Sequence, residues 1–159
     1  MIDLAHAAGV IGDNTSSLIN VKGKANSLAA AQYHLDQPFK INGSQAAYIA
    51  LGDDEPSQGL IQSLRKAPFI VVQASFVSQA TAVADVVLPV ENWMEQEGHF
   101  INLEGRLQKA SKAVDAPEDV WSNEAVIKAV AAKLGVKVKG DGWKKQLTQR
   151  VPSVAISES

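Results

Sequence analysis

Cysteine is absent from this chain of 159 residues, and histidine occurs only three times. Without cysteine the chain cannot supply a disulfide, a thiolate zinc site or cysteine ligands for an iron–sulfur cluster. His6, His34 and His99 lie far apart and form none of the HxxxH or HExxH spacings that bind zinc. We therefore predict no metal site in this chain.

The sequence also lacks long apolar runs and a strong net charge. Runs such as FIVV at 69–72 fall far below the roughly 20 residues that span a bilayer. No basic segment followed by an apolar one marks an export signal at the N-terminus. The 15 basic and 17 acidic side chains nearly cancel, which gives no field to attract nucleic acid. We expect a cytoplasmic protein without direct membrane insertion and without a nucleic-acid partner.

Motifs that announce nucleophilic catalysis or phosphate binding are missing as well. The chain has no GxSxG elbow, no Walker loop and no GxGxxG sequence after a strand. We predict no catalytic residue. Length and composition are those of one domain, which we place at 1–150, with 151–159 as a disordered tail.

The central part of the chain alternates short apolar runs with helical patterns. Apolar runs at 46–52, 69–74 and 85–89 are separated by helix-like segments at 57–67 and 78–84. Continuous apolar runs indicate strands buried on both faces, and the crossover helices make those strands parallel. The pattern predicts an α/β fold: a Rossmann-like three-layer domain with a mainly parallel sheet.

Other helices flank this unit. We expect one at 2–8, one at 25–35 with Asn26 or Ser27 as its cap, and one at 118–135. The last helix should bury an apolar stripe and end at Gly135. The stripe comprises Ala125, Val126, Ala129, Val130 and Leu134.

The acidic turn LGDDEP at 51–56 follows the first predicted strand, where open parallel sheets bind ligands. Asp53, Asp54 and Glu55 would repel a pyrophosphate at that position. The structural interpretation, which we favour, is that these carboxylates satisfy the dipole and open amides of the next helix.

The segment EGHFINLEGRLQ at 97–108 has the composition of a fixed turn. Gly98 and Gly105 can adopt conformations closed to other residues, Asn102 can bridge a turn, and Arg106 can pair with a carboxylate. Acid–base catalysis would need two carboxylates to converge, and sequence proximity does not show this. The candidates are Glu91, Glu95, Glu97 and Glu104.

Residues 71–114 resemble a segment of the molybdopterin oxidoreductase superfamily: a strand, a Thr-Ala helix, an Ala-Asp-Val-Val-Leu-Pro strand and a Glu-Gly, Asn, Glu-Gly-Arg, Gln turn. Weaker likeness at 4–12, 21–30, 48–56 and 121–135 extends it over roughly residues 4–135. The matching residues are Gln73, Thr81, Ala82, Ala84, Asp85, Leu88, Pro89, Glu97, Gly98, Asn102, Glu104, Gly105, Arg106 and Gln108.

Within that superfamily the sequence most resembles the large iron–sulfur subunit of NADH-quinone oxidoreductase (respiratory complex I), whose C-terminal half is similar in fold to formate dehydrogenases but holds no molybdenum cofactor. The resemblance implies a non-catalytic structural domain. Asp54 and Glu55 depart from the asparagine that active relatives place before the proline, which fits that reading. Glu97, Gly98, Asn102, Glu104, Gly105, Arg106 and Gln108 would then have structural roles.

The same resemblance sets the expected surroundings. Iron–sulfur clusters would belong to the parent subunit, and the partners would be the other domains and subunits of NADH-quinone oxidoreductase. The parent complex would hold the chain at the periphery of the inner membrane.

Two alternatives remain open. In the first, the chain is a cofactor-binding fragment of a true molybdopterin enzyme such as a formate dehydrogenase. Asp53, Asp54, Thr81 and Asp85 would then line a site for molybdopterin guanine dinucleotide. In the second, the chain is a binding module for an unrelated small molecule at the strand ends.

Overall fold

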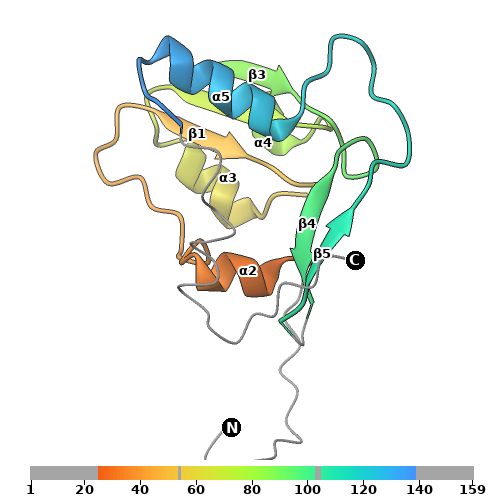
Figure 1. Cartoon of the computed structure of the whole chain (residues 1–159). Coiled ribbons are helices and arrows are strands. Elements are labelled where there is room, and N and C mark those ends of the chain that lie inside the picture. The colour runs from red at the N-terminus through yellow and green to blue at the C-terminus, as the bar shows by residue number, and fades with distance from the viewer. Residues whose placement is uncertain (1–24, 54, 103–104, 139–159) are drawn as a thin grey trace, which may run out of the picture.

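A computed structural model describes residues 25–53, 55–102 and 105–138. The helix predicted at 2–8 and the tail predicted at 151–159 lie outside these ranges. Figure 1 shows a three-stranded sheet with helices on both faces and a separate hairpin beside it. The elements are α2 (Ser27–Gln32), β1 (Ala47–Ala50), α3 (Gln58–Leu64), β2 (Ile70–Ala74), α4 (Gln79–Ala82), β3 (Val86–Pro89), β4 (Gly98–Ile101), β5 (Leu107–Ala110) and α5 (Asn123–Lys133).

The three apolar runs form the sheet β1-β2-β3, in which both pairs are parallel. Helix α3 begins at a cap, where the Ser57 hydroxyl oxygen accepts from the Leu60 amide at 3.2 Å. Helix α4 begins at a capping box formed by Ser78 and Thr81. The predicted β-α-β-α-β unit with parallel strands is thereby confirmed.

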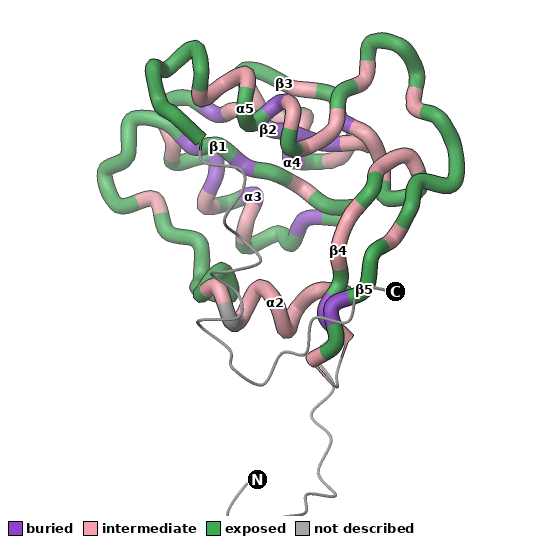
Figure 2. The backbone as a smooth tube through the Cα atoms, in the orientation of Figure 1, coloured by how far each residue is buried: buried purple, intermediate pink, exposed green. Residues whose placement is uncertain are grey.

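The main apolar core lies between the sheet and the helices α3 and α4 (Figure 2). Ile49 and Val72 of the sheet face this side, and Ile61 and Leu64 of α3 are buried with them. Removing such side chains from water is the main stabilising contribution to this half of the molecule.

The prediction that the strands are buried on both faces is wrong for β1 and β3. Side chains alternate between exposed and buried along β1, and Tyr48 is 39% exposed. In β3, Val86 is 38% and Val87 44% exposed. Register partners point to the same face, so Tyr48, Val71 and Val86 share one face. Helix α5 lies over that face but leaves part of it open.

Helix α5 is also shorter than predicted. It starts at Asn123, because Trp121 is extended and bridges Val90, and the Ser122 hydroxyl caps the helix. The expected stripe is only partly covered: Val126 is buried, Ala125, Ala129 and Val130 are half-buried, and Leu134 is 73% exposed. Gly135 ends the helix with a φ of 71°, as predicted.

Strands β4 and β5 pair antiparallel as a hairpin, with Gly98 opposite Ala110 and Ile101 opposite Leu107. A small cluster joins the hairpin to α2, in which Ile101 and Leu107 are buried against Leu28 and Tyr33. The hairpin therefore packs on α2 rather than on the parallel sheet.

Candidate functional site

The carboxyl ends of β1 and β2 lie side by side, and each is followed by a polar turn. The Ser75 hydroxyl donates to the Asp53 carboxylate at 2.7 Å, which joins the two turns. Asp53 does not cap α3, since that role belongs to Ser57, so the expected interaction of Asp53 with the helix amides is wrong. Asp54 lies outside the described residues.

Two hollows open at this edge. The smaller, about 70 Å³, is lined by Asp53, Glu55, Phe76 and Ser78 among others. The larger, about 350 Å³, lies between α4 and β3 and is lined by apolar side chains with Ser75 and Thr81. Phe76 and Val77 separate the hollows, and Val77 is 95% exposed. Neither hollow has a lysine or arginine among its described lining residues.

Thr81 belongs to this edge, but its hydroxyl is engaged within α4. The Oγ1 atom accepts from the Ser78 amide and donates to the Ser78 carbonyl, both at 2.8 Å. The Ser78 hydroxyl in turn accepts from the Ala80 amide at 3.2 Å. The amides of Ser78, Ala80 and Thr81 at the start of α4 are thus bonded within the chain itself.

Asp85 does not share this edge, which corrects its grouping with Asp53, Asp54 and Thr81. It precedes β3, and its carboxylate accepts from the Ile70 amide at 2.7 Å at the start of β2. Its own amide donates to the Ile70 carbonyl at 2.9 Å. In a parallel sheet the residue before a strand lies at the amino edge, opposite the turn of Asp53.

A pterin-dinucleotide pyrophosphate does not fit the described carboxyl edge. Such a group needs amide donors or cations. The edge instead presents the carboxylates of Asp53 and Glu55, and the first turns of α3 and α4 are capped by Ser57 and Ser78.

The hairpin residues singled out in the sequence hold a tight turn. Asn102 uses both its main chain and its side chain, because the Arg106 amide donates to Asn102 Oδ1 at 2.9 Å and the Asn102 amide donates to the Arg106 carbonyl at 3.0 Å. Gly105 has a φ of 80°. The predicted bridging role of Asn102 is confirmed, whereas Glu104 lies outside the described residues.

The remaining hairpin residues lie on the strands. Gly98 opens β4 opposite Ala110, and the exposed Gln108 pairs with Phe100. Glu97 forms an ion pair with Lys109 at 3.2 Å. Arg106 is exposed.

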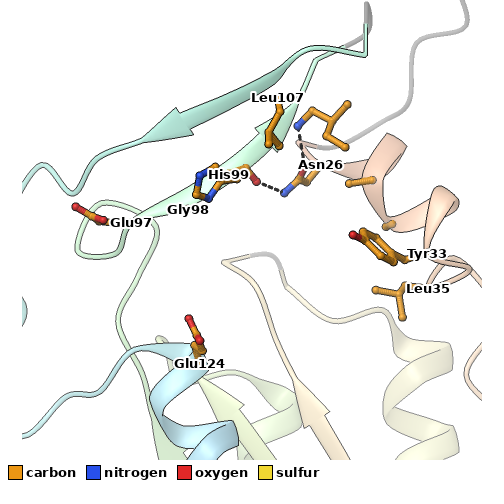
Figure 3. A pocket seen from close by; sticks show the side chains of 11 residues that line it. Asn26, Tyr33, Leu35, Glu97, Gly98, His99, Leu107 and Glu124 are labelled. Carbon is orange, nitrogen blue, oxygen red and sulfur yellow. Dashed lines mark hydrogen bonds between the residues drawn. The ribbon is translucent and has the colours of Figure 1, made fainter. Parts of the chain in front are cut away.

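Sequence reasoning missed the role of Asn26. Its side-chain amide donates to the His99 carbonyl at 2.8 Å and its oxygen accepts from the Ile101 amide at 3.1 Å. Figure 3 shows this pair of bonds at the rim of a hollow of about 440 Å³ between α2 and the hairpin. Asn26 occupies the predicted N-cap position of α2, but its backbone is left-handed and its side chain makes no cap hydrogen bond to the helix.

Three of the four candidate acid–base carboxylates line one hollow of about 370 Å³ near the start of α5: Glu91, Glu95 and Glu97. Glu95 accepts from the Asn92 amide at 2.9 Å, and Glu97 is paired with Lys109. Both partners suit a structural role. Among the described residues no group of three His, Cys, Asp or Glu side chains could hold a metal ion.

Few described groups have a shifted pKa. Partial burial raises the pKa of the Tyr48 hydroxyl. On the surface, a hydrogen bond to Asp115 raises the pKa of Lys112 and correspondingly lowers that of Asp115. Within the described residues, none of the helices has the length and apolarity needed to cross a membrane.

Comparison with known proteins gives several related enzymes. The chain is 40% identical over 103 residues to the F420-dependent formate dehydrogenase 2 subunit alpha of Methanococcus maripaludis, covering 61% of this chain and 15% of that protein. It is 35% identical over 105 residues to an NADH-quinone oxidoreductase subunit of Rickettsia felis, covering 65% of this chain and 15% of the relative.

A nitrate reductase of Symbiobacterium thermophilum is 33% identical over 113 residues, which cover 65% of this chain and 14% of that protein. The chain therefore spans about 15% of the length of the curated relatives that it matches. The sequence model of the molybdopterin oxidoreductase family matches residues 1–133. On that match, the chain belongs to the molybdopterin oxidoreductase family.

Proposed function

We propose that this chain is a non-catalytic structural domain of the large iron–sulfur subunit of an NADH-quinone oxidoreductase. Its sheet, with α3 and α4 on one face and α5 on the other, would be a Rossmann-like support within residues 1–150. Its partners would be the other domains and subunits of that complex. The parent subunit would carry the iron–sulfur clusters, and the complex would hold the chain at the inner membrane.

The observation that carries this proposal is the acidic carboxyl edge. Asp53 and Glu55 line the edge at which an open parallel sheet binds its ligands, and a serine caps each helix start at this edge. A buried or half-buried phosphate beside two carboxylates would be destabilised by like-charge repulsion. The similarity to the NADH-quinone oxidoreductase subunit of Rickettsia felis supports the assignment to this type of complex.

The test is chemical analysis of the whole polypeptide that carries this sequence, purified under conditions that retain bound cofactors. We expect iron and acid-labile sulfide but neither molybdenum, tungsten nor a pterin nucleotide. Stoichiometric molybdenum or tungsten together with a pterin nucleotide would overturn the proposal.

A second candidate is favoured by the 40% identity to a formate dehydrogenase alpha subunit. In that case the chain is part of a true molybdopterin enzyme, and the carboxyl edge binds the nucleoside end of the cofactor, with Asp53 as acceptor and the Phe76–Val77 turn as apolar wall. In the third alternative, the chain is a module that binds an unrelated small molecule, such as a nucleoside, at the same strand ends.

Calorimetric titration of the chain with guanosine and GDP separates these functions. The structural proposal predicts no saturable binding of either compound. The enzyme alternative predicts binding that Asp53→Asn weakens and that Asp119→Asn, in the exposed loop before α5, leaves unchanged. Binding of guanosine without GDP would favour the unrelated-nucleoside alternative.

A further inference from the structure

Gln73 is a fully buried amide in an otherwise apolar strand. It is 0% exposed, and the flanking residues Val72 and Ala74 face the main core. A buried amide destabilises a fold unless its donors and acceptors are bonded. Gln73 meets that requirement on both sides: the Tyr48 hydroxyl donates to its oxygen, and its nitrogen donates to Asn123 Oδ1.

The bonds continue outward from Gln73 in one direction. The Asn123 side-chain nitrogen donates to Gln96 Oε1 at 3.0 Å, and the Gln96 nitrogen donates to the Glu91 carbonyl at 3.5 Å. Each amide accepts on one side and donates on the other. Reversing any one of them would bring two donors or two acceptors together, so the four side chains keep one common orientation. We call Tyr48, Gln73, Asn123 and Gln96 the amide relay.

The apolar side of helix α5 is separate from the main core of the described molecule. No α5 residue belongs to the main apolar cluster, whose members come from β1, β2, α3, α4 and the segments around them. Val126 is the buried residue of α5, whereas Ile127 is 43% exposed. The other described attachment is the extended pairing of Trp121 with Val90 and Glu91 just before the helix.

We propose that the amide relay is a polar latch that holds the start of α5 against the open face of the sheet, with Gln73 as its central positioning residue. The relay joins β1, β2, α5 and the turn at 91–96 through side chains alone. Opening it frees α5 while the core between the sheet and α3 stays closed. This inference does not depend on the proposed function.

Hydrogen exchange measured peptide by peptide on the full chain tests the latch. We expect Gln73→Leu and Asn123→Ala to raise the exchange rate of the α5 amides about tenfold, because each removes two relay bonds. The exchange rates of the β2 amides, relative to the rate expected from global unfolding, should be the same as in the wild type. Gln62→Leu, at an exposed position of α3, is the matched control and should leave α5 unchanged.

Gln73→Glu distinguishes a latch from general loss of packing. A protonated carboxyl group, like the amide, has one acceptor and one donor, whereas a carboxylate has no donor. After correction for intrinsic exchange, α5 should be protected at low pH in this variant and released as the pH rises through the pKa of the new group.

Three results would overturn the latch. The first is wild-type protection of α5 in Asn123→Ala, and the second is an equal loss of protection in α5 and β2. The third is Gln73→Glu behaving like Gln73→Leu at every pH. If Gln73→Leu does not fold, Asn123→Ala and Gln96→Ala decide the question.

Discussion

At the scale of single residues, Asn26 shows how one side chain can replace a strand neighbour. Its side-chain nitrogen donates to the His99 carbonyl of β4, and its side-chain oxygen accepts from the amide of Ile101, two residues further along the strand. A neighbouring strand would make the same pair of bonds through its backbone. Asn26→Gly removes both bonds without straining the left-handed backbone and should cost ~1–3 kcal/mol. Urea unfolding measures this cost. Asn42→Gly in an exposed turn is the control, and equal costs for both variants would refute the role.

Tyr48 provides the residue-scale prediction for pH. Burial raises its pKa above the ordinary value of 10.0. The folded chain therefore holds this proton more tightly than the unfolded chain, so the contribution to stability is complete below pH 10.0 and is lost as the pH rises through the folded pKa. In Tyr48→Phe, the urea concentration at the unfolding midpoint should fall less steeply with rising alkaline pH than in the wild type. In Tyr33→Phe, the part of that fall that comes from Tyr48 should remain.

At the scale of elements, the β4-β5 turn depends on a left-handed glycine. Gly105 has a φ of 80°, a conformation that a side chain makes costly. Gly105→Ala should destabilise the chain by ~1 kcal/mol. Gly59→Ala in α3, where the new methyl group meets only Ser57 Oγ at 4.0 Å, should instead stabilise it by roughly 0.5–1 kcal/mol. Thermal unfolding of both variants checks the opposite signs.

Elements were the part of the fold that local sequence predicted best. Short apolar runs, the serines before α3 and α4, and Gly135 after α5 each act within a few residues, so the β-α-β-α-β order and most helix ends could be predicted. How far α5 covers the sheet could not be predicted, since an apolar run in a strand does not indicate which element packs over it. Nor could the contact of Asn26 with β4, which joins residues 73 or more positions apart.

The candidate site was predicted in position but not in detail. The turn after β1 does lie at the carboxyl edge of the sheet, as expected for parallel strands. Asp85 was grouped with that edge through resemblance, although a residue that precedes a parallel strand must lie at the other end. The Ser75–Asp53 bond needed the structure, because it joins two turns through side chains.

At the scale of the whole molecule, the sheet is buried at its centre and more exposed at its third strand, and substitutions at Val72 and Val86 test this difference. Val86→Thr, at a side chain already 38% exposed, should change the free energy of unfolding by less than ~0.5 kcal/mol. Val72→Thr introduces a hydroxyl at a fully buried position and should cost ~1–3 kcal/mol. Equal costs in urea unfolding would mean that the two positions are equally covered.

The pair of bonds between Asp85 and Ile70 also decides how the third strand can align. Side chains alternate along a strand, so sliding β3 by one residue would exchange the faces of Val86 and Val87 and break both bonds at once. With only four residues in β3, the ladder itself gives little resistance to such a shift. The alignment of the third strand thus rests in part on a carboxylate that lies before its first residue.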